Sequence, residues 1–461
     1  MTRIAILGGG PGGYEAALVA AQLGAEVTLV DRDGLGGACV LTDCVPSKTL
    51  IASSVRMMAM AEASRLGLRF DGGADHEAGR AEVHMPTVNE RVKSLAGAQS
   101  SDITRRVAGE GVQIVRGEGR LVDPRIVAVG DRRIHADIVL LATGAHPRVL
   151  PGAEPDGERI LSWRHLYDLD EVPEELIVVG SGVTGAEFAG AYLALGSNVT
   201  LVSSRDRVLP QEDADAATLM EEVFRRRGMN VLSRSRAAGV KRVGDGVVVT
   251  LEDGRTVEGS HCLMTVGMIP NTDGIGLTEA GVTLDQRGFV TTDRVSRTSA
   301  PSVYACGDCT GVQMLASVAS MQGRIAMWHA LGEAVEPLKL SNVAATIFTD
   351  PEIATVGVSQ KQVESGEVQA RVMKLPLGTN PRAKMRGFSD GFVKLFCRPA
   401  TEIVVGGVVV SPYASELILA VSIAVQERLT VHQIAHTFAV YPSMSGSVTE
   451  AARSLMTPST D

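Results

Sequence analysis

Cysteine is scarce in this sequence, with 6 among 461 residues. So few cysteines exclude a disulfide framework, and a close pair is more typical of a catalytic or metal-binding role. The chain also lacks an apolar run of about eighteen residues, the length that a membrane-spanning helix needs. Runs of Lys and Arg are absent, and the formal net charge is -9. We therefore expect neither a nucleic-acid partner nor a transmembrane segment.

The N-terminal stretch TRIAILGGGPGG shows no sign of a removable targeting segment, because it is short and leads directly into a glycine turn. We therefore expect a cytoplasmic protein. Glycine and apolar residues are plentiful, with 50 glycines and 45% hydrophobic residues, which is typical of a folded α/β protein. The chain is too long for one ordinary core, so several domains are expected.

An internal repeat indicates how the chain is organised. Residues 4–31, IAILGGGPGGYEAALVAAQLGAEVTLVD, align without gaps on residues 176–203, LIVVGSGVTGAEFAGAYLALGSNVTLVS. Each copy has an apolar run, a Gly-x-Gly-x-x-Gly turn, a segment rich in Ala and Leu, and a second apolar run. One such motif is often only a loop, but two copies in this context predict two βαβ dinucleotide-binding units.

The glycines of each motif have separate expected roles. The first permits a tight turn, the second lets the backbone approach a pyrophosphate, and the third lets the helix pack on the strand. The phosphates are expected at the helix N-terminus, where free N–H groups favour anions. These glycines are Gly8, Gly10 and Gly13 in the first copy and Gly180, Gly182 and Gly185 in the second.

The two copies differ at their last position. Asp31 ends the first copy, and its carboxylate can accept both hydrogen bonds of an adenosine ribose diol. The second copy has Ser203 there, and Arg205 follows two residues later. Without a carboxylate a 2′-phosphate is not repelled, and Arg205 can pair with it. We therefore expect NADPH at the second site, alone or alongside NADH; the alternative is that Arg205 is an ordinary surface charge.

Together with five further segments, the repeat resembles the FAD-dependent pyridine nucleotide–disulfide oxidoreductases, the family of lipoamide dehydrogenase and glutathione reductase. The resemblance runs over nearly the whole chain. The segments are GGACVLTDCVPSK at 36–48, LLATGAHP at 140–147, VGMIPN at 266–271, VYACGDCTG at 303–311 and FTDPEIATVG at 348–357.

The resemblance implies an α/β fold with two Rossmann-like dinucleotide-binding domains and a C-terminal α+β dimerisation domain. The expected order is an FAD-binding domain over 1–150, an NAD(P)-binding domain over 151–270, the second part of the FAD-binding domain over 271–340, and the dimerisation domain over 341–461. The implied cofactors are FAD and NADH or NADPH, and the implied assembly is a homodimer.

The resemblance also implies roles for single residues. Lys48 matches the lysine beside the flavin and Glu187 its ion-pair partner; a cation there would stabilise the anionic reduced flavin. The residues expected at FAD are Gly8, Gly10, Gly13, Asp31, Lys48, Thr143, Gly144 and Asp308. Those expected at NAD(P) are Gly180, Gly182, Gly185, Glu187, Ser203, Arg205 and Gly267.

Two cysteine pairs lie in the matching segments. Cys306 and Cys309 form a C-x-x-C, but no nearby Cys or His pair completes a zinc site, so we expect small buried residues around a cofactor loop and no metal. Cys39 and Cys44 match the redox pair of disulfide-reducing relatives. There Cys44, near a helix N-terminus, would be the flavin-facing thiolate and Cys39 the interchange thiol, and a disulfide between them is expected.

Two departures affect this thiol chemistry. Asp43 replaces a glycine of the relatives, and its carboxylate opposes thiolate formation at Cys44 and occupies space where a substrate approaches. The relatives also carry a catalytic His and an orienting Glu near the chain end, where this sequence has Tyr441 and Gly446. Tyrosine is a poor base at neutral pH, and losing a positioned acid–base costs about 10²- to 10⁴-fold.

The combination resembles the branch of the family that acts as NAD(P)H:quinone reductases, in which hydride passes from NAD(P)H through the flavin to a quinone-type acceptor. The expected catalytic residues are Cys39, Cys44, Lys48, Glu187 and Tyr441. Tyr441 would donate a hydrogen bond to a quinone oxygen or only fill the space of the imidazole. Two alternatives stay open: a dihydrolipoamide dehydrogenase or other low-molecular-weight disulfide reductase that uses Cys39 and Cys44, and a flavin-binding redox sensor without turnover.

Overall fold

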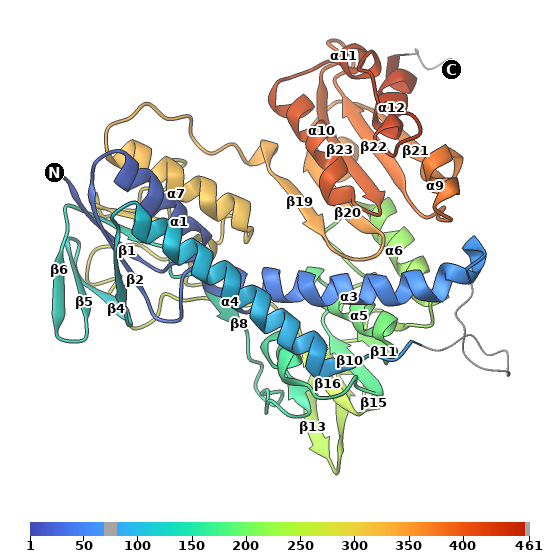
Figure 1. The fold of residues 1–461 in the computed structure, drawn as a ribbon, viewed down its shortest axis with the longest axis horizontal. Coiled ribbons are helices and arrows are strands. Elements are labelled where there is room, and N and C mark those ends of the chain that lie inside the picture. Colours follow the sequence, from blue (N-terminus) through green and yellow to red (C-terminus); the bar gives the residue numbers. More distant parts are fainter. Residues whose placement is uncertain (69–80, 457–461) are drawn as a thin grey trace.

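The computed structural model describes residues 1–68 and 81–456, and these form three lobes (Figure 1). The lobe at the left contains the N-terminus, a second lies below it, and the third contains the C-terminal segments in orange and red. Each lobe is built around its own five-stranded sheet. The predicted α/β class is confirmed. The predicted domain boundaries stay a prediction, and residues 69–80 and 457–461 of the first and last predicted domains lie outside the described residues.

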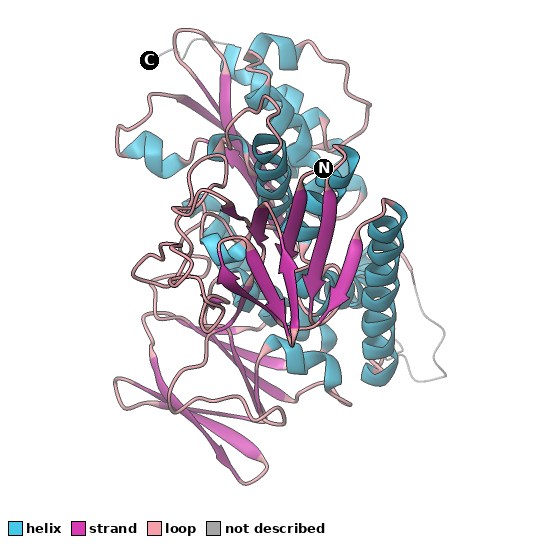
Figure 2. Cartoon of the chain, turned by 90° about the vertical axis from the view of Figure 1, so that its left-hand side faces the viewer, coloured by secondary structure: helices cyan, strands magenta, loops and turns pink. Residues whose placement is uncertain are grey.

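The first lobe has a parallel sheet of order β18-β7-β1-β2-β3, which faces the viewer in Figure 2. Its strands are β1 (Arg3–Leu7), β2 (Glu26–Asp31), β3 (Gln113–Arg116), β7 (Ile138–Leu141) and β18 (Val303–Ala305). Its strands are rich in buried Val, Ile and Leu, as expected for a parallel sheet covered on both faces. Because β18 comes from far along the chain, a later segment completes the first sheet.

Helices and an antiparallel ribbon surround this sheet. The helices are α1 (Pro11–Gln22), α2 (Gly37–Leu41), α3 (Cys44–Glu62), η1 (Ala63–Leu66), α4 (Met85–Gly109), η3 (Asp308–Thr310) and α7 (Ala316–Ala330). The ribbon consists of β4 (Gly119–Asp123), β5 (Ile126–Val129) and β6 (Arg132–His135). Helix α1 packs against α7, so the N-terminal motif is braced by the late segment that also supplies β18.

The second lobe repeats the first, with a parallel sheet of order β12-β11-β10-β16-β9. Its elements are β9 (Ile160–Leu161), η2 (Trp163–Asp168), β10 (Glu175–Val179), α5 (Val183–Leu195), β11 (Asn198–Val202), α6 (Ala214–Arg226), β12 (Asn230–Leu232), β13 (Ala237–Val243), β14 (Gly246–Leu251), β15 (Thr256–Gly259) and β16 (His261–Met264). The β10-α5-β11 unit corresponds to β1-α1-β2, so both copies of the sequence repeat form the predicted βαβ unit. Antiparallel pairing of β8 (Ala145–Pro147) with β17 (Met268–Pro270) joins the two crossings between the lobes.

The third lobe has an antiparallel sheet of order β19-β20-β23-β22-β21. Its elements are η4 (Leu340–Asn342), β19 (Ala344–Ile347), β20 (Glu352–Gly357), α8 (Gln360–Glu364), β21 (Arg371–Pro376), η5 (Leu377–Thr379), α9 (Pro381–Met385), β22 (Phe392–Cys397), β23 (Val404–Ser411), α10 (Ala414–Gln426), α11 (Val431–Ala435) and α12 (Gly446–Met456). Helix α10 packs on β20 and β23, which places the core of this lobe between helix and sheet.

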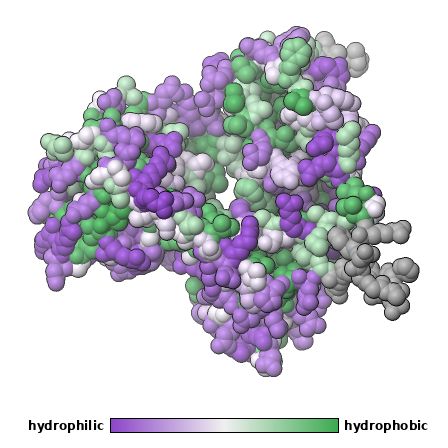
Figure 3. Space-filling view, viewed as in Figure 1, coloured by the Kyte–Doolittle hydropathy of each residue, from purple (hydrophilic) through white to green (hydrophobic). Residues whose placement is uncertain are grey.

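Helix α3 links the three lobes. It begins at Cys44, beside the first sheet, packs against α5 of the second lobe, and passes below the third lobe in Figure 1. The viewed face is largely hydrophilic, with apolar patches between the purple regions (Figure 3). Helix α3 therefore begins near the first glycine motif and ends where the second and third lobes meet.

Candidate active site

The first glycine motif forms a backbone cradle at the N-terminus of α1. Gly8 has φ +102°, and a Cβ atom there would lie 2.1 Å from the Ala142 carbonyl oxygen. A Cβ atom at Gly13 would lie 1.9 Å from the Gly8 carbonyl oxygen, whereas one at Gly10 would meet no atom of the described residues within 4 Å. Gly8 and Gly13 are thus required by the turn and by helix packing, and Gly10 leaves the helix N-terminus open to a phosphate.

A long cleft of about 1460 Å³ runs from this cradle to the start of α3. It is lined by residues of many separate segments of the chain, from residues 7–12 to residues 314–319, and by Arg164 of the second lobe. Those expected from the sequence to hold FAD and found on its walls are Gly8, Gly10, Asp31, Thr143, Gly144 and Asp308. Cys39 and Cys44 lie at the same cleft, so the structure brings the nucleotide motif and the cysteine pair to one continuous surface.

Asp31, at the end of β2, holds the cleft's loops together. Its Oδ2 accepts a hydrogen bond from the Gly9 N–H at 2.7 Å, and its Oδ1 accepts from Asp33 and Gly34 at 2.9 and 2.6 Å. A carboxylate that bonds three backbone amides is fixed in position. Asp31 therefore shapes the glycine turn, and its contact with a ribose stays a prediction.

Asp308 follows the buried strand β18 and lies on the opposite wall. Burial raises the pKa of its carboxyl to about 6, and the charge of Asp43 adds to the rise. A carboxyl in this state can both donate and accept hydrogen bonds near neutral pH. This versatility suits a polar group beside a bound nucleotide.

Lys48 and Glu187 form an ion pair between α3 and α5, with Nζ and Oε2 2.8 Å apart. The other Glu187 oxygen accepts a hydrogen bond from the Phe348 N–H at 2.9 Å, and the Lys48 ammonium lies 5.0 Å from the centre of the Phe348 ring. Glu187 is 4% exposed, so its charge is held by these two partners. The pair expected from the sequence is present, joined by Phe348, which sequence reasoning did not identify.

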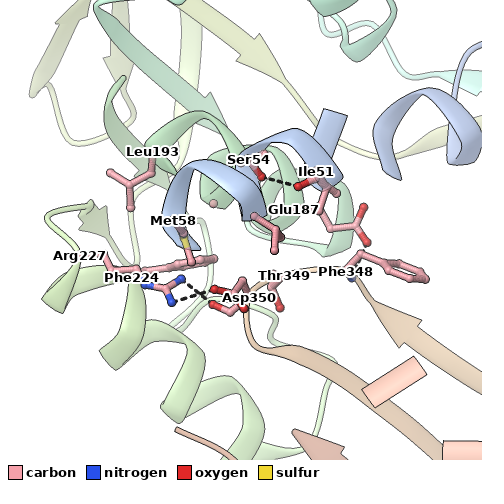
Figure 4. Close-up of a pocket in the computed structure, with 13 residues that line it drawn as sticks. Ile51, Ser54, Met58, Glu187, Leu193, Phe224, Arg227, Phe348, Thr349 and Asp350 are labelled. Carbon is pink, nitrogen blue, oxygen red and sulfur yellow. Dashed lines mark hydrogen bonds and ion pairs between the residues drawn. The ribbon is translucent and has the colours of Figure 1, made fainter. Parts of the chain in front are cut away.

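Behind this pair lies a small cavity between α3, α5 and the segment before β20 (Figure 4). The close-up shows Glu187 and Phe348 on one side and the Arg227–Asp350 ion pair, 2.9 Å long, on the other. The Ser54 hydroxyl donates a hydrogen bond to the Ile51 carbonyl of the same helix, so this polar group of the cavity wall already has a partner. The cavity marks the junction of the three lobes rather than a second ligand cleft.

Cys39 and Cys44 are separate thiols in this structure, on α2 and at the first position of α3. A hydrogen bond from Cys39 lowers the pKa of the Cys44 thiol, against the effects of burial and of Asp43, while Lys48 also lowers it. The same bond raises the pKa of Cys39. The surroundings thus favour Cys44 as the thiolate, and the predicted disulfide stays a prediction.

The second glycine motif reproduces the first at α5. A Cβ atom at Gly180 would lie 2.3 Å from the Thr265 carbonyl oxygen, and one at Gly185 would lie 1.9 Å from the Gly180 carbonyl oxygen. A Cβ atom at Gly182 would meet none of the atoms that the structure describes within 4 Å. Gly267, also expected at NAD(P), has φ +104° just before β17. The second helix N-terminus is therefore open in the same way as the first.

Ser203 and Arg205 differ from each other in their surroundings. Ser203 is fully buried, and its hydroxyl bonds the Ser181 hydroxyl at 2.7 Å and accepts from the Arg205 N–H at 3.2 Å. The Arg205 side chain is exposed, with no ion pair to any residue in the ranges that the structure describes. Ser203 therefore sets the loop, and the guanidinium of Arg205 is available to a ligand.

Tyr441 lies far from the Cys39–Cys44 pair in sequence and is 81% exposed, between α11 and α12. His432 pairs with Glu402 at 3.1 Å, and the His436 ring bonds the His432 carbonyl, so both histidines are engaged within their own lobe. Cys306 and Cys309 are buried at 1% and 0% exposure, and the Cys309 thiol donates to the Cys306 carbonyl. Within residues 1–68 and 81–456 there is no group of metal-ligating side chains.

Two further residues surround the thiol end of the cleft and were missed by sequence reasoning. Arg164 of η2 lines the cleft, and Tyr167 of the same turn is 5% exposed with a hydroxyl that bonds no residue within 1–68 and 81–456. Neither belongs to a motif, and no local pattern identifies them. Only the packing of η2 against the α3–α5 region places them there.

A family model described as pyridine nucleotide-disulphide oxidoreductase matches residues 2–323, and the dimerisation domain of the same family matches residues 343–452. The chain belongs to this family. No helix among the described residues is long and apolar enough to cross a bilayer.

Within the family, one relative is an NAD(P)H dehydrogenase (quinone) of Mycobacterium tuberculosis, 57% identical over 470 residues, which cover 99% of this chain and 94% of that protein. A dihydrolipoyl dehydrogenase of Chlamydia trachomatis is 32% identical, over 97% of this chain and 95% of that protein. The crystal structure of LpdA from Mycobacterium tuberculosis superimposes with a TM-score of 0.93 at 56% identity, covering 99% of this chain and 100% of the other.

This membership implies FAD and a pyridine nucleotide as cofactors, and the residues present fit both. Gly10 and Gly182 leave two helix N-termini open for pyrophosphates. The cleft is large enough for a dinucleotide and ends beside Lys48's helix. The cofactor-contacting roles of the individual residues stay predictions.

Proposed function

We propose that this protein is an FAD-dependent NAD(P)H:quinone oxidoreductase that acts as a homodimer. The quinone acceptor is suggested by the name of the relative that is 57% identical, and the homodimer by the match to a dimerisation domain. The observation that carries the proposal is a contrast between two groups of residues that the family uses in catalysis. The Lys48–Glu187 pair is complete at 2.8 Å, whereas a tyrosine stands where disulfide-reducing relatives have their acid–base histidine.

The residues of the chain would divide the work as follows. FAD, when bound, supplies a centre that accepts hydride from NAD(P)H and passes it to the acceptor. Lys48, held by Glu187, places a positive charge where reduction adds negative charge. The walls of the cleft orient the nucleotide, and Cys39 and Cys44 contribute packing beside the reacting groups without thiol exchange.

Exposed apolar side chains support a homodimer. Leu419 and Ile423 of α10 are 61% and 49% exposed, and Phe438, Val440 and Tyr441 form an exposed apolar segment nearby in the same lobe. Apolar groups in such number on one lobe are typical of an interaction surface. A second copy that covers this surface would place Tyr441 in the contact between the two subunits.

The proposal is tested by comparing acceptors. Menadione should be reduced at the expense of NAD(P)H faster than lipoamide or glutathione disulfide, and a Cys39→Ala, Cys44→Ala double variant should retain quinone turnover within about threefold, since packing changes of this size are modest. Steady-state kcat/KM for each acceptor is the measurement. Quinone turnover that collapses in the double variant would contradict the proposal.

A disulfide reductase is the second candidate, because the two thiols are hydrogen-bonded to each other and Cys44 is the more acidic. Lipoamide turnover in the wild type that matches quinone turnover and disappears in the double variant would support it. Binding of NAD(P)H without bleaching of the flavin would instead indicate a redox sensor.

We also propose that the second nucleotide site accepts NADPH through Arg205. Its exposed guanidinium lies just after β11, where a 2′-phosphate on the adenosine ribose would be reached. Arg205→Ala should raise KM for NADPH about tenfold, which corresponds to one charge-assisted contact, and leave KM for NADH unchanged. Arg236→Ala is the matched control, because Arg236 is an exposed arginine of the same lobe that lies 3.8 Å from Glu252. An equal effect on both nucleotides would count against this role.

A further inference from the structure

Asp43 is an aspartate at a helix N-cap that does not cap its helix. Aspartate at this position normally accepts a hydrogen bond from the free amides of the first turn. At the start of α3 the side chain of Asp43 makes no such bond, and its backbone has φ −128° and ψ −96°. Its carboxyl lines the cleft and has no hydrogen bond or ion pair to any residue in the described parts of the chain. The Asp43 carboxyl therefore has no partner among the described residues and lines the thiol end of the cleft.

Charged and polar groups from every neighbouring element influence this carboxyl. Burial raises the pKa of Asp43; Lys48 of α3 opposes the rise, Glu187 of α5 adds to it, and Arg164 of η2 opposes it. Cys44 adjoins it on α3, and Asp308 faces the same cleft from η3.

A second unpartnered group lies close by. The Tyr167 hydroxyl is buried and bonds no other described residue, and after burial the largest influence that raises its pKa is the charge of Asp43. A buried hydroxyl without a partner costs free energy unless a ligand or an ordered water satisfies it. Asp43 and Tyr167, two polar groups without side-chain partners among the described residues, thus lie together at the thiol end of the cleft.

We propose that Asp43 is the proton donor to the reduced acceptor, in the place of the acid–base histidine that this chain lacks. The inference rests on the proposed quinone reductase activity and deepens it. Asp43, which the sequence analysis treats only as a group that opposes thiolate formation at Cys44, thereby has a catalytic role.

The step is balanced in protons and electrons. NAD(P)H supplies two electrons and one proton as hydride, and a quinone that receives a hydride becomes a hydroquinone monoanion. Its second oxygen needs one more proton. The O–H bond of the Asp43 carboxyl breaks, a new O–H bond forms on the acceptor, and the resulting carboxylate takes a proton from bulk water through the open side of the cleft.

The pH dependence follows from this role. Only the protonated carboxyl can donate, so kcat with a quinone should fall as pH rises through the pKa of Asp43. Burial raises that pKa above the ordinary value, which moves the fall towards neutral pH. The Asp43→Asn variant cannot donate this proton, so its kcat should no longer fall with rising pH in this range.

The test compares wild type, Asp43→Asn and Asp43→Glu in the FAD-loaded enzyme with menadione. Asp43→Asn should lower kcat about 100-fold on the acidic side while flavin bleaching by NADPH stays near the wild-type rate, and Asp43→Glu should restore part of the loss. The same Asp43→Asn change in the Cys39→Ala, Cys44→Ala background should have an equal effect, because the role does not pass through the thiols. Asp102→Asn, an exposed carboxylate on α4 paired with Arg105, is the control and should change nothing.

A readout independent of turnover is the infrared difference spectrum of wild type minus Asp43→Asn across the pH range. It should contain a protonated-carboxyl band that disappears at the same pH at which kcat falls. Wild-type quinone turnover combined with unchanged Asp43→Asn kinetics would overturn the inference, as would a carboxyl ionised throughout the active range, or an effect that vanishes in the double-cysteine background. Failure of the proposed function looks different: wild type itself would then not reduce the quinone.

Discussion

Replacing Lys48 with methionine should slow the reduction of the flavin by NAD(P)H about 100- to 1000-fold, the range found when one preorganised charge is removed from a reaction centre. Methionine keeps the length and apolar stem of lysine and removes only the ammonium. Stopped-flow absorbance of flavin bleaching gives the rate. The midpoint potential of the bound flavin should become more negative in the same variant, because the anionic reduced form loses a stabilising cation.

The expected size of this effect depends on how firmly the ammonium is held. Glu187 binds Nζ at 2.8 Å from α5, and Glu187 is in turn held by the Phe348 N–H at 2.9 Å. A charge fixed by partners on two other elements needs little reorganisation when negative charge develops nearby. Glu187→Gln should therefore have a smaller effect than Lys48→Met, because the ammonium stays in place and the amide oxygen can still accept one of the two hydrogen bonds.

Lys93→Met is the matched control. Lys93 is a lysine of α4 that forms an exposed ion pair with Asp168 at 2.6 Å, outside the cleft. Its replacement should leave bleaching unchanged. Thermal unfolding of all variants separates a loss of charge from a loss of structure. Flavin reduction in Lys48→Met at the wild-type rate would exclude the electrostatic role of this residue.

Replacing Lys394 with methionine should lower the free energy of unfolding by about 3–5 kcal/mol, the cost of leaving a buried charge without its partner. Lys394 of β22 is 2% exposed, and its ammonium donates to both carboxylate oxygens of Asp213 at 2.9 and 2.8 Å. Asp213 is 3% exposed and also caps α6 by accepting from the amides of Asp215 and Ala216. The variant would loosen the contact between the third lobe and the second nucleotide-binding lobe.

Urea denaturation of the FAD-loaded protein is the measurement for Lys394. Lys374→Met is the control: Lys374 lies on the adjacent strand and binds Asp215 at 2.9 Å, but it is 42% exposed and should cost less than about 1 kcal/mol. Adding Asp213→Asn to Lys394→Met should restore part of the stability, because the unpaired charge is removed. An equal decrease in the free energy of unfolding in Lys394→Met and Lys374→Met would show that the buried ion pair stabilises the protein no more than the exposed one.

This network also predicts a dependence on pH. Burial raises the pKa of Asp215, but hydrogen bonds from Lys394 and Lys374 lower it more, and the net shift is downward from 3.8. A lowered pKa in the folded protein gives stability that is fully present above the unfolded value and is lost as pH falls through the folded value. The difference between wild type and Lys394→Met should therefore shrink in strong acid.

The sequence anticipated the repeated units because their requirements are local. The turn leaves no room for a side chain at Gly8, and a Cβ atom at Gly13 would lie 1.9 Å from the Gly8 carbonyl oxygen, so both positions require glycine. The same applies to Gly180 and Gly185 in the second copy. The α/β class followed from two such units, each with a buried strand before the turn and a second strand after the helix.

Contacts between distant segments were accessible only where a family pattern supplied them. The Lys48–Glu187 pair spans α3 and α5 and was expected from resemblance alone, and its third member Phe348 was missed. Ser203 was expected at a nucleotide, yet its hydroxyl is buried against Ser181 and holds the loop of Arg205. The sequence identified Ser203 and Arg205 at the end of β11, but it did not predict that Ser203 is buried and Arg205 exposed.

The sequence by itself determined the two nucleotide-binding units, the cysteine pair and the loss of the acid–base histidine, because these depend on residue identity and short spacing. The tertiary structure decided what surrounds the cysteines: η2 brings Arg164 and Tyr167 to the start of α3, and the Asp43 carboxyl lies in the cleft instead of capping its helix. The physical reason is that the state of a carboxyl depends on burial and on charges within several ångströms, and those charges come from helices more than one hundred residues apart in the chain.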